Sequence, residues 1–151
     1  MNRMSTLLAS LITIVILLTL GVSPVYAADC PQPGDMIPVT IDVKPGSYPN
    51  PVNLKSEGLV PVALLGSGTF DVYNVDPGTI EFHPMGRCEQ VVAPVRYAFE
   101  DVNQDGYVDT VFHFKTQEAG FQAGDTEACL HGNLNSGQHF CGHDTIVIIG
   151  Y

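Results

Sequence analysis

The sequence predicts an all-β protein folded as a single antiparallel β-sandwich, and three observations support this. Apolar and polar residues alternate with a period of two in many short runs, which is typical of strands with one buried face. The chain has 15 Gly and 11 Pro residues, which interrupt these runs and leave little room for helices. After the N-terminal segment, no run longer than a turn has helical spacing. Many short strands separated by turns indicate a sandwich.

The N-terminal segment reads as a secretory signal peptide. Arg3 precedes an apolar run at residues 7–22, and the small-residue site Val25–Ala27 follows it. The apolar run is short for a membrane span and contains Ser and Thr. We therefore expect a signal peptide at residues 1–27 that is cleaved on export, and one secreted domain at residues 28–151. The sequence leaves open whether this domain is extracellular or periplasmic and whether it associates with the cell envelope.

About eight short strands are expected in the domain. The first alternates clearly and ends at the turn Lys44–Gly46, and a polar, Pro-rich loop follows it up to Gly58. The strands are predicted at residues 37–43, 59–65, 69–72, 79–82, 91–99, 110–115, 127–131 and 145–149. Their number and spacing favour an immunoglobulin-like or jelly-roll-like sandwich with little helix apart from the signal peptide.

The four cysteines predict two disulfides. They follow an export signal, so the thiols mature in an oxidising compartment, and an even count is typical of complete pairing. Three connectivities are open. We favour Cys129–Cys141, because these residues flank a predicted hairpin with its turn at Asn135–Gly137. Cys30–Cys88 then follows by elimination.

An acidic stretch, EDVNQDGYVDTVFHFK, runs into one of the predicted core strands. Ca²⁺ takes about six to eight oxygen ligands, and the odd positions of a tightly wound loop supply them, with Gly at position 6. Counted from the first Asp of this stretch, oxygen donors occupy positions 1, 3, 5, 7 and 9. We predict a calcium site with the ligands Asp101, Asn103, Asp105, the backbone carbonyl of Tyr107, and Asp109. The alternative is an acidic turn that binds nothing, because Asp, Asn and Gly favour turns by themselves.

The flanks of this loop distinguish it from a helix-loop-helix calcium site. Position 12 is Phe112 where the helical version has a bidentate Glu, and the residues on both sides alternate like strands. Asp109 is therefore expected to be the closing carboxylate. The loop resembles the strand-loop-strand calcium loops of FG-GAP repeats in integrin-type propellers, which implies that Asp109 is a direct ligand.

Four further segments carry a second resemblance. They are IDVKPGSYPNPVN, GLVPVALLGSGTFDVYNVDPGTIEF, EDVNQDGYVDTVFHFKTQEAG and GDTEACLHG. Together they resemble a recurrent, uncharacterised module of exported bacterial and archaeal proteins. The resemblance implies an extracellular β-rich module with a calcium loop at residues 101–109, and it implies no catalytic residues. The cysteines and residues 83–94 depart from the pattern of this module.

The leading hypothesis is a secreted, non-catalytic, calcium-binding β-domain with a structural, adhesive or envelope-associated role. The net charge of −10 disfavours nucleic acid and anionic membranes as partners and favours cations. An extracellular protein, a glycan or a second copy of the chain stays open as a partner. No ordered nucleophile and base can be identified, so we expect no enzyme, and a small secreted hydrolase is the least favoured hypothesis.

Two further hypotheses rest on side-chain types. A carbohydrate-binding module would need exposed flat aromatic rings; the chain has no Trp, and Tyr48, Tyr73 and Tyr107 are the candidate platforms. Cys129 and Cys141 alternate with histidines on the predicted hairpin, and imidazole with thiolate suits a transition metal. If the cysteines are oxidised, the ligands of such a second metal would be His131, His139 and His143.

Overall fold

The computed structural model describes residues 36–151, so the predicted signal peptide at residues 1–27 lies outside it. This part of the chain contains strands and two short 3₁₀ helices but no α-helix, and none of its helices could cross a membrane. The strands are β1 (Ile37–Pro38), β2 (Ile41–Val43), β3 (Pro51–Asn53), β4 (Leu59–Leu64), β5 (Val75–Pro84), β6 (Arg96–Glu100), β7 (Asp109–Lys115), β8 (Glu127–Leu134), β9 (His139–Thr145) and β10 (Val147–Ile149); the 3₁₀ helices are η2 (Val72–Asn74) and η3 (Thr116–Glu118).

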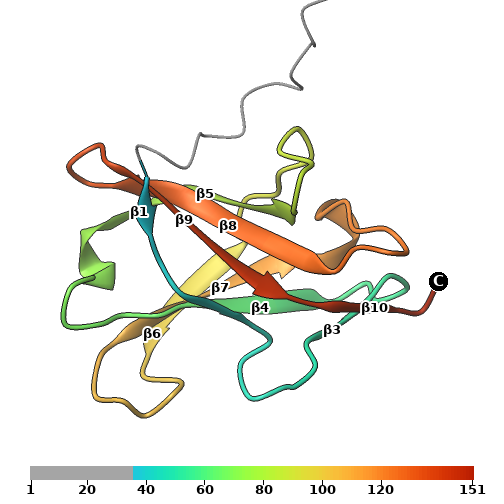
Figure 1. Ribbon diagram of the computed structural model, residues 1–151, viewed down its shortest axis with the longest axis horizontal. Coiled ribbons are helices and arrows are strands. Elements are labelled where there is room, and N and C mark those ends of the chain that lie inside the picture. The colour runs from blue at the N-terminus through green and yellow to red at the C-terminus, as the bar shows by residue number, and fades with distance from the viewer. Residues whose placement is uncertain (1–35) are drawn as a thin grey trace, which may run out of the picture.

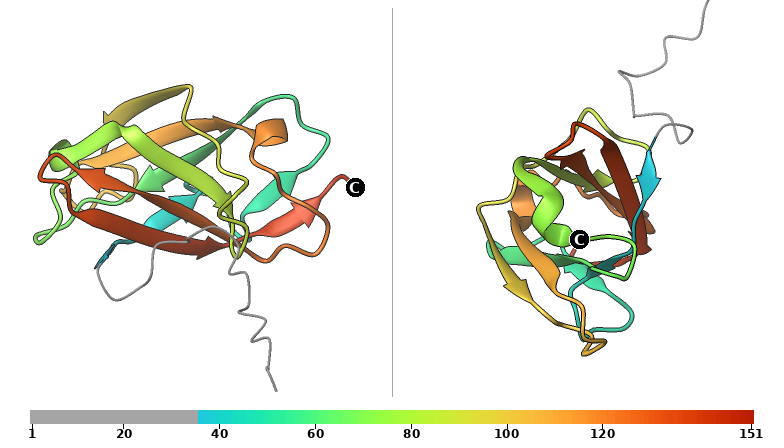
Figure 2. Two further views of the ribbon diagram at one scale, coloured as in Figure 1. Left: turned by 90° about the horizontal axis from the view of Figure 1, so that it is seen from above. Right: turned by 90° about the vertical axis from the view of Figure 1, so that its left-hand side faces the viewer.

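Two four-stranded sheets form the layers of the fold (Figures 1 and 2). Sheet A has the order β1-β9-β8-β5, and sheet B has the order β2-β4-β7-β6. The pairs β5–β8 and β8–β9 in sheet A and all pairs in sheet B are antiparallel. The predicted all-β sandwich is therefore confirmed. Two pairs are parallel where the prediction was antiparallel, β1 with β9 and β3 with β10.

Aromatic side chains fill the space between the sheets. Phe82 on β5 stacks on Phe114 of β7 with ring centroids 4.8 Å apart, and Phe121 packs on Phe82 at 5.4 Å. Phe112 and Phe140, on sheets B and A respectively, are also fully buried. One buried cluster joins these rings with Val, Ile and Leu residues of both sheets. Burial of this apolar surface holds the two layers together.

The predicted strand at residues 37–43 is divided between the two sheets. The amide of Val39 donates to the carbonyl of Cys141 in sheet A, whereas the carbonyl of Thr40 accepts from Leu65, next to β4 of sheet B. The chain therefore passes from one sheet to the other between these two residues. Alternation of side chains is the same on either sheet, so it predicts the strand but not the crossing.

Several predicted boundaries were wrong. The segment at residues 69–72 forms a tight turn and enters η2, where Asp71 caps the helix by accepting from the amide of Tyr73. The predicted turn at Asp76–Gly78 is an irregularity inside β5. Within residues 91–95, Val92 forms only an isolated bridge to Phe82.

Two strands were missed because their partners are distant in sequence or their pattern is weak. β3 lies in the predicted Pro-rich loop and pairs with β10, which is almost a hundred residues later (Figure 1). β9 has one large apolar side chain, Phe140, among mostly small or polar residues, and the predicted strand began only at its last residue, Thr145. The hairpin turn at Asn135–Gly137 between β8 and β9 is confirmed, and the amide of Gly137 donates to the carbonyl of Leu134.

Replacement of Phe114 by Ala tests the inter-sheet core. Because Phe114 is fully buried against Phe82, its truncation should lower the free energy of unfolding by about 3 to 5 kcal/mol. The matched control is Phe99→Ala on β6, where the ring is half exposed, and its loss should be less than half as large. Urea unfolding followed by near-ultraviolet circular dichroism measures both. Equal losses would contradict this account of the core.

Candidate functional site

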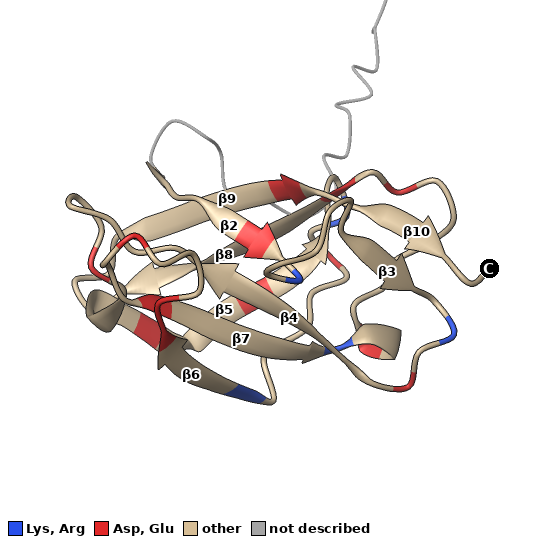
Figure 3. Ribbon diagram, turned by 90° about the horizontal axis from the view of Figure 1, so that it is seen from below, with Lys and Arg blue, Asp and Glu red and all other residues tan. Residues whose placement is uncertain are grey.

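The acidic loop lies between two paired strands. β6 and β7 form an antiparallel hairpin in which Glu100 pairs with Asp109, so the loop at residues 101–108 closes its end. In Figure 3, several of the red acidic segments lie where β6 ends and β7 begins, and others are spread over the fold. The strand-loop-strand arrangement predicted from the alternating flanks is therefore present, and no helix borders the loop.

Three of the predicted ligands lie on one turn of the backbone. The Asp101 carboxylate accepts the amides of Asp105 at 3.2 Å and Gly106 at 3.0 Å. The side-chain oxygen of Asn103 accepts the same Asp105 amide at 3.1 Å, and its nitrogen donates to the Asp105 carboxylate at 2.9 Å. Gly106, at position 6, has a φ of +90°, a conformation that a Cβ would disfavour. The oxygens of positions 1, 3 and 5 therefore surround a single turn.

Asp109 lies beneath this turn and is fully buried. One carboxylate oxygen accepts the amide of Gly66 at 2.8 Å, and the other accepts the amide of Val102 at 3.0 Å. Gly66 belongs to the loop after β4, so the carboxylate ties that loop to the β6–β7 hairpin. The backbones approach so closely here that a Cβ on Gly66 would overlap the carbonyl oxygen of Val108.

No basic side chain pairs with the acidic loop among the ion pairs of residues 36–151. Those pairs are Arg87–Asp125, Lys115–Glu118, His131–Glu81 and His143–Glu127. Within residues 36–151, the clustered negative charge of the loop is offset by amide groups of the backbone and of Asn103 and not by a basic side chain. Such a cluster attracts a cation and is destabilised without one by mutual repulsion.

The donors of the loop fit a hard cation in their chemistry. Asp101, Asn103 and Asp105 offer oxygen atoms, and each carboxylate oxygen of Asp109 keeps one lone pair beyond the amide that it accepts. Over residues 36–151, however, no group of three or more His, Cys, Asp or Glu side chains is already arranged around an ion position. Binding would therefore require side-chain rotation at the exposed positions 1, 3 and 5.

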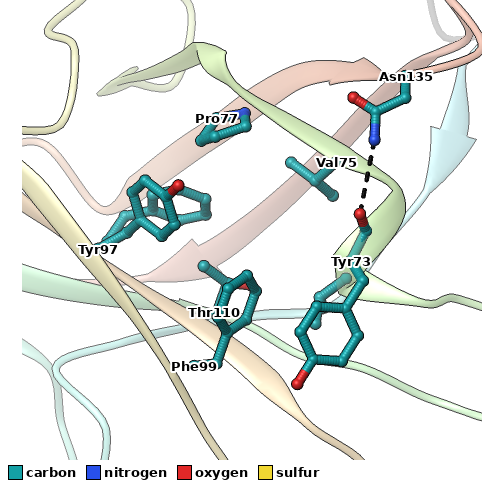
Figure 4. A pocket seen from close by; sticks show the side chains of 9 residues that line it. Tyr73, Val75, Pro77, Tyr97, Phe99, Thr110 and Asn135 are labelled. Carbon is teal, nitrogen blue, oxygen red and sulfur yellow. Dashed lines mark hydrogen bonds between the residues drawn. The ribbon is translucent and has the colours of Figure 1, made fainter.

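A second feature is an aromatic groove of about 270 Å³ that opens between the edges of the two sheets (Figure 4). Tyr73, Tyr97 and Phe99 line it, and each ring is about half exposed. The rings of Tyr73 and Phe99 are 4.6 Å apart, and that of Tyr97 meets Phe99 at 5.9 Å. Of the three tyrosines predicted as sugar platforms, only Tyr73 lies here.

The remaining two predicted platforms are elsewhere, and two ring residues were missed. Tyr48 is 93% exposed in the loop before β3, and Tyr107 lies in the acidic loop. Tyr97 and Phe99 belong to the edge strand β6, where alternation predicts inward-facing core positions. Sheet A does not cover this edge, so their rings remain accessible. The spacing of two residues between Tyr97 and Phe99, which places both rings on one face of a strand, is the sequence signal that could have identified them.

Cys129 and Cys141 lie on adjacent strands of sheet A with their sulfur atoms 3.1 Å apart, and both are free thiols in this structure. The disulfide between Cys129 and Cys141 therefore remains a prediction. The hydrogen bond that Cys129 makes to Cys141 lowers the pKa of Cys141 to about 7 and raises the pKa of Cys129, because one thiol proton is shared by two sulfurs. The second predicted pair includes Cys30, which lies outside the described residues.

Comparison of this chain with protein-family models, with curated proteins and with solved structures finds no match.

Gly66→Ala tests the contact beneath the acidic loop. The new Cβ would overlap backbone rather than a flexible side chain, so we expect a loss of about 1 to 3 kcal/mol in the free energy of unfolding. Gly68→Ala is the matched control, because its Cβ would meet only the mobile hydroxyl end of Tyr107. Chemical denaturation measures both variants. A Gly66→Ala protein as stable as Gly68→Ala would show that the loops are not held at this point.

Proposed function

We propose that this chain is a secreted, non-catalytic, calcium-binding β-domain with a structural, adhesive or envelope-associated role. The observation that carries the proposal is the placement of Asp101, Asn103 and Asp105 on one turn above the buried Asp109, without a basic partner. Oxygen donors of this kind are those that Ca²⁺ prefers. The backbone carbonyl of Tyr107 is proposed as the fifth donor.

The proposed role of the ion is to hold the end of the fold together. Its charge would offset the repulsion among the loop carboxylates, and Asp109 links the same loop to Gly66 after β4. Calcium at 100 times its Kd would stabilise the folded chain by about 2.7 kcal/mol if it binds only the folded state. Extracellular modules bind calcium with Kd values of roughly 10⁻⁴ to 10⁻³ M, which suits structural stabilisation better than sensing.

The hydroxyl oxygen of Ser67, in the turn after β4, accepts the amides of Thr69 and Phe70 at 3.3 and 3.1 Å and so stabilises that turn. The hydrolase hypothesis requires turnover of an ester, peptide or glycoside, and detection of such turnover in purified protein would displace the present proposal.

Calcium should raise the melting temperature of the protein, and Asp101→Asn should weaken that effect. Relative to protein in EDTA, calcium at 100 times its Kd should raise Tm by roughly 8 to 12 °C, from about 2.7 kcal/mol of binding free energy. Asp101→Asn removes a charged ligand and should raise the calcium Kd by at least about tenfold, or about 1.4 kcal/mol. Differential scanning calorimetry and isothermal titration measure these changes.

Glu100→Gln is the matched control for the calcium experiment. It removes one negative charge from the end of β6 and leaves every proposed ligand in place, so the calcium Kd should change by less than about twofold. If EDTA and calcium give the same Tm, or if Glu100→Gln weakens binding as much as Asp101→Asn does, the loop holds no specific ion.

A second candidate function is carbohydrate binding, which the aromatic groove favours. Tyr73, Tyr97 and Phe99 present clustered, half-exposed rings, and the side chain of Asn135 lies at the rim, where its nitrogen donates to the carbonyl of Tyr73 (Figure 4). Flat rings beside polar groups suit the apolar face and hydroxyls of a sugar. This function is compatible with a calcium-stabilised domain, because the groove and the acidic loop use different residues.

Truncation of the groove rings tests the carbohydrate proposal. A glycan array should identify a bound sugar, and Tyr73→Ala should weaken that interaction by about tenfold or more, or about 1.4 kcal/mol, through loss of one stacking surface. Tyr48→Ala is the control, since Tyr48 lies outside the groove and should leave the affinity unchanged. An array without hits, or equal effects of the two substitutions, would exclude this groove as a sugar site.

A further inference from the structure

The outer face of sheet A brings together side chains that bind transition metals. Alternation along β5, β8 and β9 sends Phe82, Leu130 and Phe140 into the core, so their neighbours face outward. The register places these outward residues in two adjacent rows, Glu81–His131–Cys141 and His83–Cys129–His143. With His139 beside them, this face holds four of the five histidines of the chain and both free thiols of residues 36–151. The three strands are adjacent in Figure 1.

His83 has the features of an unused metal ligand. Its side chain is only 2% exposed although it lies on the outer face of the sheet. Nδ1 lies 2.8 Å from the carbonyl oxygen of Pro84, and since a carbonyl only accepts, Nδ1 must carry the proton. Nε2 is then unprotonated and has a free lone pair, and this atom is buried without any hydrogen-bond partner. Histidines that ligate metals are held in this way, with the other ring nitrogen donating to a carbonyl or carboxylate.

His131 provides a second buried nitrogen beside the first. Its ring lies 5.1 Å from that of His83 in an edge-on arrangement, and its Nε2 is also buried without a hydrogen-bond partner. The nearest carboxylate oxygen, on Glu81, is 3.5 Å away, which is beyond a good hydrogen bond. Buried polar atoms are nearly always hydrogen-bonded, so two unpartnered ones side by side indicate a missing partner.

The two thiols lie next to these imidazoles in the ladder. Cys129 is directly opposite His83, and Cys141 is directly opposite His131. Directly opposed residues have Cβ atoms about 4.5 to 5.5 Å apart, within reach of a shared ion. The sulfur atoms of Cys129 and Cys141 approach each other to 3.1 Å. Two sulfurs and two imidazole nitrogens therefore lie within one small area on three adjacent strands.

We propose that His83, Cys129, His131 and Cys141 form a binding site for a divalent transition-metal ion, with Zn²⁺ as the fitting case. Two thiolates and two neutral imidazoles are a common tetrahedral zinc set, with Zn–S bonds of about 2.3 Å and Zn–N bonds of about 2.0 Å. On binding, each cysteine releases its thiol proton to solvent, and the two thiolates balance the charge of the ion.

Binding of an ion requires rotation of the side chains from their present positions. In residues 36–151 no three of these donors already surround a common point. Two sulfurs bound to one tetrahedral zinc stand roughly 3.8 Å apart, so the thiols must separate by about 0.7 Å from their present 3.1 Å. A depression of about 410 Å³ opens to solvent beside His131, which is the one proposed ligand that lines it.

This ligand set differs from the one that alternation on the hairpin predicts. His139 and His143 lie on the same face, but both are exposed, and His143 faces Glu127 at 3.8 Å. His83 comes from β5, which is not part of the hairpin. The site is also independent of the proposed calcium loop, which is on sheet B and offers only oxygen donors.

Cobalt titration tests the proposal, because cobalt reports its ligands by colour. Protein kept reduced with a phosphine should bind one equivalent of Co²⁺ with a thiolate-to-cobalt charge-transfer band and the intense visible bands of tetrahedral geometry, and one equivalent of Zn²⁺ should remove them. Cys141→Ser should abolish the charge-transfer band or reduce it by at least half, and His131→Ala should weaken binding at least tenfold. His113→Ala, on sheet B, is the histidine control and should bind as the unchanged protein does.

Two further measurements keep the test decisive if a variant folds poorly. Alkylation of the unchanged protein with iodoacetamide should prevent cobalt binding, and prior loading with zinc should slow that alkylation at least tenfold. Asp101→Asn, in the acidic loop, should leave the cobalt spectrum unaltered. The proposal is wrong if no charge-transfer band forms, if His131→Ala binds as tightly as His113→Ala, or if Asp101→Asn removes the binding.

Discussion

Two hydrogen bonds accepted by the Asp109 carboxylate hold together the end of the fold where the acidic loop meets the loop after β4. A fully buried carboxylate is costly unless its oxygens are satisfied, and here the amides of Gly66 and Val102 satisfy both. The same bonds hold the loop after β4 against the β6–β7 hairpin. Because Gly66 has no Cβ, the two backbones can come into contact. The acidic turn at residues 101–108 therefore has a defined base.

The fixed position of Asp109 beneath the acidic turn supports the calcium proposal. The carboxylates of Asp101 and Asp105 stand on a turn whose position is set by Asp109, and amides rather than cations presently offset their charge. An ion at this turn would bind groups on a backbone that is already held in place, so only the exposed side chains would have to rotate. It would also stabilise a contact between segments that are far apart in the sequence.

The three candidate sites occupy different parts of the sandwich and offer different chemistry. The loop end of sheet B presents oxygen donors, the uncovered edge between the sheets presents aromatic rings, and the outer face of sheet A presents sulfur and nitrogen donors. These suit, in turn, a hard cation, the apolar face of a sugar and a borderline transition metal. A disulfide between Cys129 and Cys141 would occupy both sulfurs, so the disulfide and the proposed zinc site compete for the same atoms.

Local sequence determined the strand-rich class, the position of β4 and β7, the hairpin turn at Asn135–Gly137 and the turn that gathers Asp101 and Asp105. Each of these depends on residues close together in the chain, where alternation, Gly and Asx side chains act directly. Only the tertiary structure decided the crossing between sheets at Val39–Thr40, the pairing of β3 with β10 and the groove formed by Tyr73 with Tyr97 and Phe99. It also decided that Asp109 meets an amide 43 residues away and that His83 joins Cys129 and His131. Strand partners and register follow from burial of the whole core, and no periodicity within one segment encodes which distant segment will lie beside it.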